Sequence, residues 1–275
     1  MRFPTIPRLP QAAGFRIACA AVLLASGSSA TAQAVEESSA INERLELAGT
    51  PLVYRSRLRI ANEFSENETE GDRDKLVLGA AFGFGFDGVN RNYAAGFDLP
   101  LLHREAPGED ECWGLGDLKL RFGQKWMDQP GAWRAGWFFE SEFDTADDAV
   151  RAIANQRTQM AFGGGAARPL GDWFLLTGTL QYGWSLDEGT TNGSKSEWET
   201  HFVASFQPTS HLSFNLDYKA TLNTAGTNDV MNALEPGVGW TFGEDHEFGL
   251  SVSCEVPLNE SSTDWTSKIG LTWFF

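Results

Sequence analysis

The stretch Lys75-Leu-Val-Leu-Gly-Ala-Ala-Phe-Gly-Phe-Gly-Phe86 decides the fold, because its residues alternate between two kinds of face. Its even-numbered positions hold leucine, alanine and phenylalanine, whereas its odd-numbered positions hold Lys75, Val77, one alanine and three glycines. A period of two is typical of a β-strand, in which successive side chains point to opposite faces. Further apolar faces of this kind are predicted at residues 52–60, 93–101, 118–126, 133–143, 158–166, 174–184, 198–206, 212–220, 234–242, 248–256 and 265–275. The sequence therefore predicts an all-β protein of twelve strands.

Charge separates the two faces of these strands. The apolar faces carry no Asp, Glu, Lys or Arg, although 21% of the chain is charged. On the first strand, Leu58 and Ile60 alternate with Arg57 and Arg59. A soluble β-sandwich buries its apolar face, whereas a membrane barrel turns that face toward lipid and encloses the polar one. We therefore predict a transmembrane, antiparallel, up-and-down β-barrel whose last strand pairs with its first, because an open edge in hydrocarbon leaves backbone groups unpaired.

The connections between the predicted strands alternate in length. Long ones fall at residues 65–74, 102–116, 145–155, 185–197 and 222–230, and short ones at 88–90, 127–132, 169–171, 208–211 and 243–246. Outer-membrane barrels have short periplasmic turns and longer outside loops. This phase is the one expected when the first strand starts in the periplasm, and it predicts location in a bacterial outer membrane.

The residues before the barrel divide into two segments. Arg2, Arg8 and Arg16 form a basic leader, residues 17–25 are apolar, and Ala32-Gln-Ala34 has the small residues of a cleavage site. Residues 1–34 are therefore predicted to be a signal peptide. Residues 35–51 form a short periplasmic segment, either a free tail or a small plug, and residues 52–275 form the barrel.

The chain ends Ile269-Gly-Leu-Thr-Trp273-Phe-Phe275, an alternating strand with a terminal aromatic residue. This end resembles the carboxy-terminal signal of bacterial outer-membrane barrels, which their assembly machinery recognises. The resemblance implies that Trp273 and Phe275 form an assembly signal and that the barrel assembly machinery is a partner.

Net charge excludes one class of partner. Without the three arginines of residues 1–34, 18 basic residues face 37 acidic ones, a net charge of −19. Nucleic acid is therefore not expected to bind. Much of the acid lies between strands, as in residues 66–74 and 109–111. These segments are either solvated loops or sites where divalent cations bridge the protein to lipopolysaccharide, which with the other outer-membrane lipids is an expected partner.

The polar faces predict what the barrel interior does. Arg55, Arg57 and Arg59 form a basic ladder, flanked by Lys75 and Lys268 on neighbouring strands that supply no acid. If Trp126 pairs with Trp133, Lys119 lies opposite Glu140, and further acids at Glu199, Asp217 and Glu235 line the other wall. Opposed walls of this kind select solutes by charge. Alternatively, the charges pair across a narrow lumen and close it. The candidate lumen and selectivity residues are Arg55, Arg57, Arg59, Lys119, Arg121, Glu140, Glu142, Glu199 and Lys268.

Two patterns suggest other chemistry and are set aside. Residues 83–88 have the spacing G-x-G-x-x-G, but they lie in a strand with no helix after them, so the dinucleotide-binding context is missing. His103 and His201 are the histidines placed where a rim hydrolase would need one, yet no nucleophile accompanies them. No metal-ligand cluster appears, so we expect neither an enzyme nor a cofactor.

Three short motifs carry a family resemblance: Gly114-Leu-Gly-Asp-Leu-Lys-Leu120 with Phe122, Gly96-Phe-Asp-Leu-Pro100 and Pro169-Leu-Gly-Asp-Trp173. They resemble the outer-membrane transporter-like family named for the MetA pathway of phenol degradation. The resemblance implies passage of small, often aromatic molecules and no catalytic residues, whereas the basic ladder favours anionic solutes. We therefore expect an outer-membrane channel or transporter for small anionic or aromatic solutes. The alternatives are a closed structural or surface-interaction barrel and a rim-located hydrolase.

Overall fold

The computed structural model describes residues 52–53, 55–66, 72–85, 92–105, 111–129, 133–151, 154, 158–186, 196–224, 230–243, 247–259 and 265–275. The predicted signal peptide and the segment 35–51 lie outside these residues. Every regular element described is a strand, and none of the described residues forms a helix able to span a membrane. The strands are β1 (Arg57–Glu66), β2 (Asp72–Phe84), β3 (Tyr93–Glu105), β4 (Cys112–Leu115), β5 (Leu118–Gln129), β6 (Trp133–Phe143), β7 (Gln159–Leu170), β8 (Phe174–Ser185), β9 (Ser196–Thr209), β10 (Leu212–Asn223), β11 (Val230–Phe242), β12 (Phe248–Pro257) and β13 (Trp265–Phe274).

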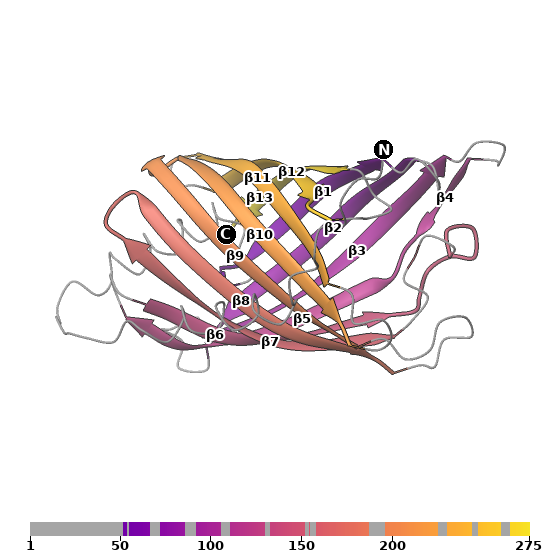
Figure 1. The fold of residues 1–275 in the computed structure, drawn as a ribbon, viewed down its shortest axis with the longest axis horizontal. Helices are drawn as coiled ribbons and strands as arrows, with labels where there is room; N and C mark the ends of the chain where they lie inside the picture. The colour runs from indigo at the N-terminus through magenta and orange to yellow at the C-terminus, as the bar shows by residue number, and fades with distance from the viewer. Residues whose placement is uncertain are drawn as a thin grey trace, which may run out of the picture. The chain divides into compact units, whose positions relative to one another are not determined.

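The sheet closes on itself, as predicted. Each long strand is antiparallel to its neighbours, and β1 pairs with β13 from Arg57 opposite Phe274 to Glu66 opposite Trp265. In Figure 1 the indigo β1 therefore lies beside the yellow β13. Twelve strands form the closed antiparallel barrel, which confirms the predicted fold class. We call the end with both termini of the described barrel the turn end, and the opposite end the loop end.

β4 is an additional strand that the sequence pattern placed in a loop. It pairs with β3 alone, from Leu101 opposite Leu115 to Arg104 opposite Cys112, whereas β5 pairs with the other half of β3. Asp117 holds the next connection in place, because its Oδ1 accepts hydrogen bonds from the backbone N–H groups of Thr145 (2.9 Å) and Ala146 (3.0 Å). The loop-end connection between β3 and β5 is thus part of the wall.

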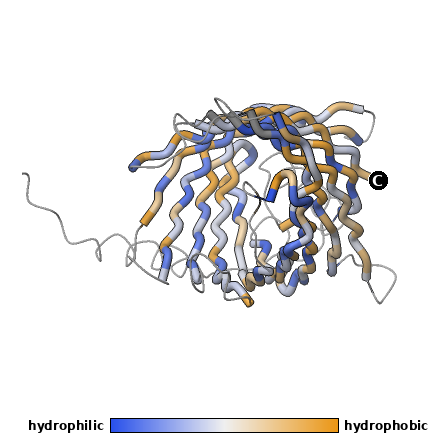
Figure 2. The backbone as a smooth tube through the Cα atoms, turned by 90° about the vertical axis from the view of Figure 1, so that its right-hand side faces the viewer, coloured by the Kyte–Doolittle hydropathy of each residue, from blue (hydrophilic) through white to orange (hydrophobic). Residues whose placement is uncertain are grey.

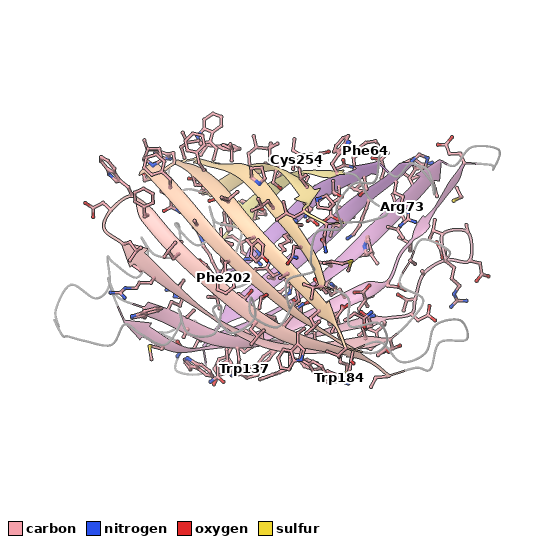
Figure 3. All side chains as sticks on the ribbon, viewed as in Figure 1. Phe64, Arg73, Trp137, Trp184, Phe202 and Cys254 are labelled. Atoms are coloured by element: carbon pink, nitrogen blue, oxygen red, sulfur yellow. The ribbon has the colours of Figure 1, made fainter. Side chains whose placement is uncertain are left out.

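The apolar faces point outward, as predicted. Alternating colours along the strands in Figure 2 reflect a period of two in hydropathy. Ile60 is 52% exposed, Leu78 46% and Ile269 49%, although each lies in the middle of a strand. Trp137 and Trp184 likewise project from the wall (Figure 3). An apolar exterior of this extent is stable only against lipid, because water would meet a continuous hydrophobic surface.

Two turns at the turn end need glycine. Gly171, between β7 and β8, has a φ of 66°, and Gly243, between β11 and β12, has a φ of 99°. Both values lie in the left-handed region, which a side chain makes costly. These glycines allow reversals short enough to keep adjacent strands in register.

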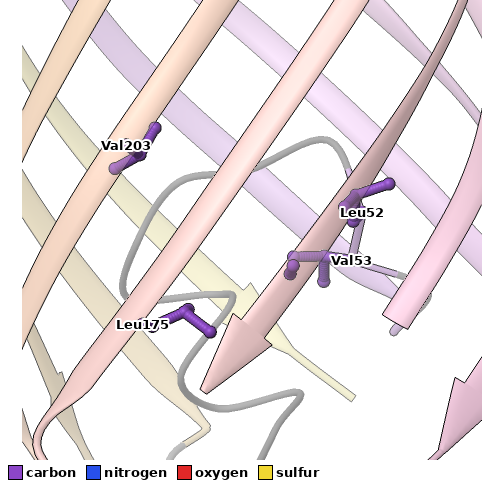
Figure 4. Close-up of a cluster of buried hydrophobic side chains, with 5 residues drawn as sticks. Leu52, Val53, Leu175 and Val203 are labelled. Carbon is purple, nitrogen blue, oxygen red and sulfur yellow. The ribbon is translucent and has the colours of Figure 1, made fainter. Parts of the chain in front are cut away.

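The first predicted strand begins later than expected. β1 starts at Arg57, and Leu52 and Val53 before it lie inside the barrel. Leu52 is fully buried and Val53 is 4% exposed, packed with Ala167, Leu175 and Val203 of β7, β8 and β9 (Figure 4). The predicted outward direction of Leu52 and Ser56 is therefore wrong, and Tyr54 lies outside the described residues. Residues 52 and 53 pack against apolar side chains of the inner wall and are removed from water there. If the strand continued through them, they would not gain this contact.

Ser56 fixes the point where this inner segment joins the wall. Its carbonyl oxygen accepts a hydrogen bond from the backbone N–H of Phe275 at 3.0 Å, and its Oγ accepts one from the N–H of Gly83 at 3.1 Å. The segment 52–56 thus crosses from the inner faces of β7, β8 and β9 to the first strand, and it narrows the lumen at that level.

Candidate functional site

The enclosed polar faces surround a cavity of about 470 Å³ inside the barrel. Its lining includes inward side chains of β1, β5 and β6 and of every strand from β8 to β13. This volume lies within the range of about 300–1,000 Å³ typical of small-molecule sites. The charged residues of the lining fall into separate groups, which determine where a solute could bind.

The first group, the Arg121 cluster, joins β3, β5 and β6. Arg121 Nε donates to Glu140 Oε1 at 2.5 Å, and its Nη1 lies 3.9 Å from Asp98 Oδ2. Lys119 Nζ lies 3.3 Å from Glu142 Oε2 and 3.9 Å from Glu140 Oε2. Both predicted cations of β5 are therefore engaged by carboxylates.

The predicted pairing of β5 with β6 is wrong by two residues. Lys119 lies opposite Glu142, not Glu140, because the register shifts between Lys125 and Met127 and Gln129 pairs with Trp133. A bulge of this kind adds a residue to one strand and interrupts the alternation there, so the successive residues Trp126 and Met127 are both exposed. The contact of Lys119 with Glu140 survives through the length of the lysine side chain.

His201 lies in the second group, between two carboxylates. Its Nε2 is 2.7 Å from Glu199 Oε1 and its Nδ1 is 3.1 Å from Asp217 Oδ2. Gln181 Nε2 donates to the other oxygen of Glu199 at 2.5 Å. Because a carboxylate accepts hydrogen bonds and does not donate them, both ring nitrogens act as donors in this arrangement. Neither nitrogen is then left to take a proton from a nucleophile, and this geometry does not favour a hydrolase.

The third group, the lysine–glutamate cluster, joins β10, β11, β12 and β13. Lys268 Nζ lies 2.8 Å from Glu235 Oε2 and 2.8 Å from Glu255 Oε2. Lys219 Nζ lies 2.7 Å from Glu255 Oε2 and also bonds to Glu235. Ser253 Oγ donates to Glu235 Oε1 at 2.5 Å. Two cations and two anions thus neutralise each other on the inner wall.

We expect Glu235→Gln to lower the free energy of unfolding by about 1–3 kcal/mol, because two lysines would then share one carboxylate in a partly desolvated site. Urea-induced unfolding in lipid vesicles, followed by tryptophan fluorescence, measures this change. Glu247→Gln is the matched control, since Glu247 is exposed beside a turn. An equal effect of the two substitutions would contradict the assigned role of the lysine–glutamate cluster.

The basic ladder differs from the prediction in two respects. Arg55 precedes β1, and its guanidinium lies 5.3 Å from the centre of the Phe274 ring. The closure seam also contains acid, because Glu63 of β1 bonds to Lys75 Nζ at 3.1 Å and Lys268 reaches Glu235 and Glu255. These acids come from β1, β11 and β12 and not from the neighbouring strands β2 and β13, so the wall is not purely basic.

Arg57 and Arg59 line the cavity, as Lys268 on the neighbouring strand does. Arg59 forms no hydrogen bond or ion pair with any other residue in the described part of the chain, and it acts on Glu63 only through longer-range attraction. Arg59 lies opposite Gly79 of β2 and Thr272 of β13. A Cβ on Gly79 would lie 2.2 Å from Asp98 Oδ1, so this glycine leaves room for the carboxylate of Asp98.

Two charged residues of the lumen were not identified from the sequence. Asp98 lies between Phe97 and Leu99, and the same period-two alternation predicts its inward direction. Glu63 was missed because the alternation was not followed past Ile60, although β1 continues to Glu66. Within the described ranges, no group of three or more His, Cys, Asp or Glu residues could hold a metal ion.

The remaining predicted residues lie outside the lumen. His103 faces the outer wall near the loop end, stacked 4.1 Å from the ring of Trp113, with Nε2 2.8 Å from Glu111 Oε1. Hydrogen bonds from Trp113 and His103 hold the pKa of Glu111 below its usual value. Trp273 and Phe275 lie at the end of β13 with their ring centres 5.3 Å apart, and both are 45% exposed. Their role in assembly stays a prediction.

A closed antiparallel barrel with an apolar exterior and an ionic interior defines the class of β-barrel membrane proteins. Comparison with solved structures agrees. The COG4313 outer membrane channel of Pseudomonas putida F1 is similar over 80% of this chain and 96% of its own, with a TM-score of 0.66 and 12% identity. The NanC porin is similar over 78% and 98%, with a TM-score of 0.58 and 6% identity. The KdgM porin is similar over 80% and 99%, with a TM-score of 0.52 and 8% identity.

No protein-family model matches the chain, and no curated protein matches it in sequence. At these identities the likeness concerns the fold. The structural neighbours are outer-membrane channels and porins, not enzymes.

Proposed function

We propose that the protein is an outer-membrane channel that passes small solutes through the barrel. The observation that carries this proposal is the cavity of about 470 Å³, lined by ionic and hydroxyl side chains and enclosed by a wall whose outer face is apolar. An apolar interior would stabilise the barrel at least as well as this polar one does. The polar interior also does nothing for the contact with lipid. It is accounted for if water and solutes enter the lumen. The predicted signal peptide and the similarity of fold to known channels support location in the outer membrane.

We further propose that the channel prefers anions. Lys75, Lys119, Arg121, Lys219 and Lys268 each lie within 4 Å of a carboxylate, so their charges are largely neutralised. Arg59 is different, because no described carboxylate binds it. A lumen cation without a bonded partner among the described residues attracts a mobile anion. This argument applies equally to inorganic anions and to anionic solutes.

We expect Arg59→Glu to lower the ratio of chloride to potassium permeability at least about fivefold. An ion 4 Å from one side-chain charge in water interacts with it by about 1 kcal/mol, which corresponds to about this factor. Arg57→Glu is expected to act in the same direction. Reversal potentials in planar bilayers under a KCl gradient measure the ratio. Lys75→Glu is the control of equal charge change, because Lys75 lies nearer solvent and is bonded to Glu63. Unchanged selectivity in both arginine variants would exclude them as selectivity residues.

The finer identity of the solute rests on the resemblance to the MetA-pathway family, which implies small aromatic molecules. The cavity has apolar lining residues, such as Val53, Phe138 and Val203, against which a phenyl ring could pack. Aromatic solutes that also carry negative charge satisfy both the resemblance and the arginines. We propose such compounds as solutes of this channel.

A closed barrel is the second candidate function. The observation that favours it is the burial of Leu52 and Val53 against the inner faces of β7, β8 and β9, together with ion pairs that join neighbouring strands on the inner wall. A closed barrel acting through its outer surface shows no conductance, with or without these two side chains. Conductance of the wild-type protein would exclude it.

A further inference from the structure

A small recess beside the main cavity combines positive charge with apolar side chains. The recess has a volume of about 40 Å³, and its lining includes three cations, Arg57, Arg59 and Arg121, one acid, Asp98, and the apolar side chains of Val53, Ala94 and Phe138. A single water needs about 10–15 Å³ measured in this way. The recess therefore accepts a group of a few atoms, such as a carboxylate, but not a whole solute.

The recess adjoins the main cavity. Both are lined by Val53, Arg57, Arg59, Arg121 and Phe138. A solute whose head group lies in the recess must therefore extend its remaining atoms into the cavity of about 470 Å³. Val53 and Phe138 line both spaces and Val203 lines the main cavity, so apolar side chains lie close to the arginines at this end.

The charges fix the sign of the head group. Arg121 is bonded to Glu140, whereas Arg59 has no bonded partner in the described part of the chain. An arginine guanidinium presents paired donors that match the two oxygens of a carboxylate. The register places Gly79 and Thr272 on either side of Arg59. The carboxylate of Asp98 lies against Gly79, and its Oδ2 is 3.9 Å from Arg121 Nη1, so the three arginines of the recess outnumber its one acid.

The apolar side chains restrict the body of the solute. Hydroxyl groups placed against Val53, Phe138 and Val203 would lose their bonds to water without gaining a partner. Methylene or aromatic carbons lose no hydrogen bonds there and are removed from water. A polyhydroxylated acid therefore fits this end of the cavity less well than an acid with an apolar body.

We propose that the recess is a binding subsite for small monocarboxylates with an apolar body, with Arg59 as the carboxylate-binding residue. The inference rests on the proposed channel function and narrows its solute class. This preference would distinguish the protein from a channel selective for acidic sugars. Acidic sugars carry the same charge, but their carbon skeleton bears many hydroxyl groups.

Three six-carbon probes test the proposal: hexanoate, gluconate and hexylammonium. The full chain is reconstituted in planar bilayers, and the probe concentration that halves the chloride current is measured. Hexanoate is expected to block at about tenfold lower concentration than gluconate, roughly the gain from burying about two methylene groups. Hexylammonium is expected not to block. Calorimetric titration of the detergent-solubilised full chain measures the same preference without requiring conduction.

Two variants locate the site. Arg59→Gln is expected to weaken hexanoate block about tenfold, whereas the control Lys75→Gln, with the same charge change at a cation that has its own partner, leaves it unchanged. Val203→Thr keeps the side-chain shape and is expected to weaken hexanoate while leaving acetate unaffected. Absence of chloride current in the wild type would contradict the channel function alone. Equal affinity for hexanoate and gluconate, or an equal effect of both glutamine substitutions, would overturn the subsite.

Discussion

Replacing Leu52 and Val53 together by aspartate is expected to raise the single-channel conductance severalfold. Both side chains are buried against Ala167, Leu175 and Val203 inside the barrel. Carboxylates cannot remain in such a contact without losing hydration, so the segment would leave the inner wall. The lumen at that level, which Leu52 and Val53 now partly occupy, would then have the full cross-section of a twelve-stranded barrel. Single-channel recordings in planar bilayers measure the change directly.

The control for this experiment places the same charge where it cannot affect the lumen. Leu258 is 53% exposed just after β12, at the loop end, so Leu258→Asp is expected to leave the conductance unchanged. A double variant at positions 52 and 53 that conducts like the wild type would show that the inner segment does not limit flow. An increase in both variants would instead point to a general loosening of the barrel.

A charge on the outer face of the closure seam is expected to have the largest effect on stability. Leu271 is 46% exposed on β13 and lies opposite Ile60 of β1, in the middle of the pairing that closes the barrel. Leu271→Arg is expected to lower the free energy of unfolding by about 2–4 kcal/mol, the cost of a basic side chain at mid-depth in lipid. Urea-induced unfolding in phospholipid vesicles measures it.

The matched control uses the inner face of the next strand, β12, which also pairs with β13. Ser251 of β12 lies opposite Gly270 of β13 and lines the water-accessible cavity, so Ser251→Arg is expected to cost much less. Equal destabilisation by the two arginines would contradict the outward direction of the apolar face. Stability of the folded wild type in water without detergent would contradict it as well.

The wall of the barrel could be predicted from the sequence because the signal is local. Leu78 and Phe82 face outward and Gly79 faces inward for the same reason, since successive residues of a pleated strand point to opposite sides. The inward direction of Arg59, Lys119, Arg121, Glu140, Glu199 and Lys268 follows from the same alternation. The antiparallel order follows from short connections, and closure follows from the need to pair every backbone group in lipid.

The limits of the first strand could not be predicted in this way. Leu52 continues the alternation of Leu58 and Ile60, yet its side chain is buried on the opposite wall of the lumen. That position depends on the apolar side chains that β7, β8 and β9 present, which are more than a hundred residues away in the chain. Alternation fixes the direction of a side chain only while the residue belongs to the sheet.

By itself, the sequence determined most of the wall, the face that meets lipid and the inward direction of charged residues on the strands it located. The partners of those charges were decided by the tertiary structure. Lys268 of β13 binds Glu235 of β11 across the intervening strand, because the curvature of a closed barrel brings inward side chains together. The bulge between Lys125 and Met127 likewise sets which acids lie opposite Lys119. The same three-dimensional arrangement leaves Arg59 without a bonded partner in the described chain. The periodicity of the sequence does not predict this.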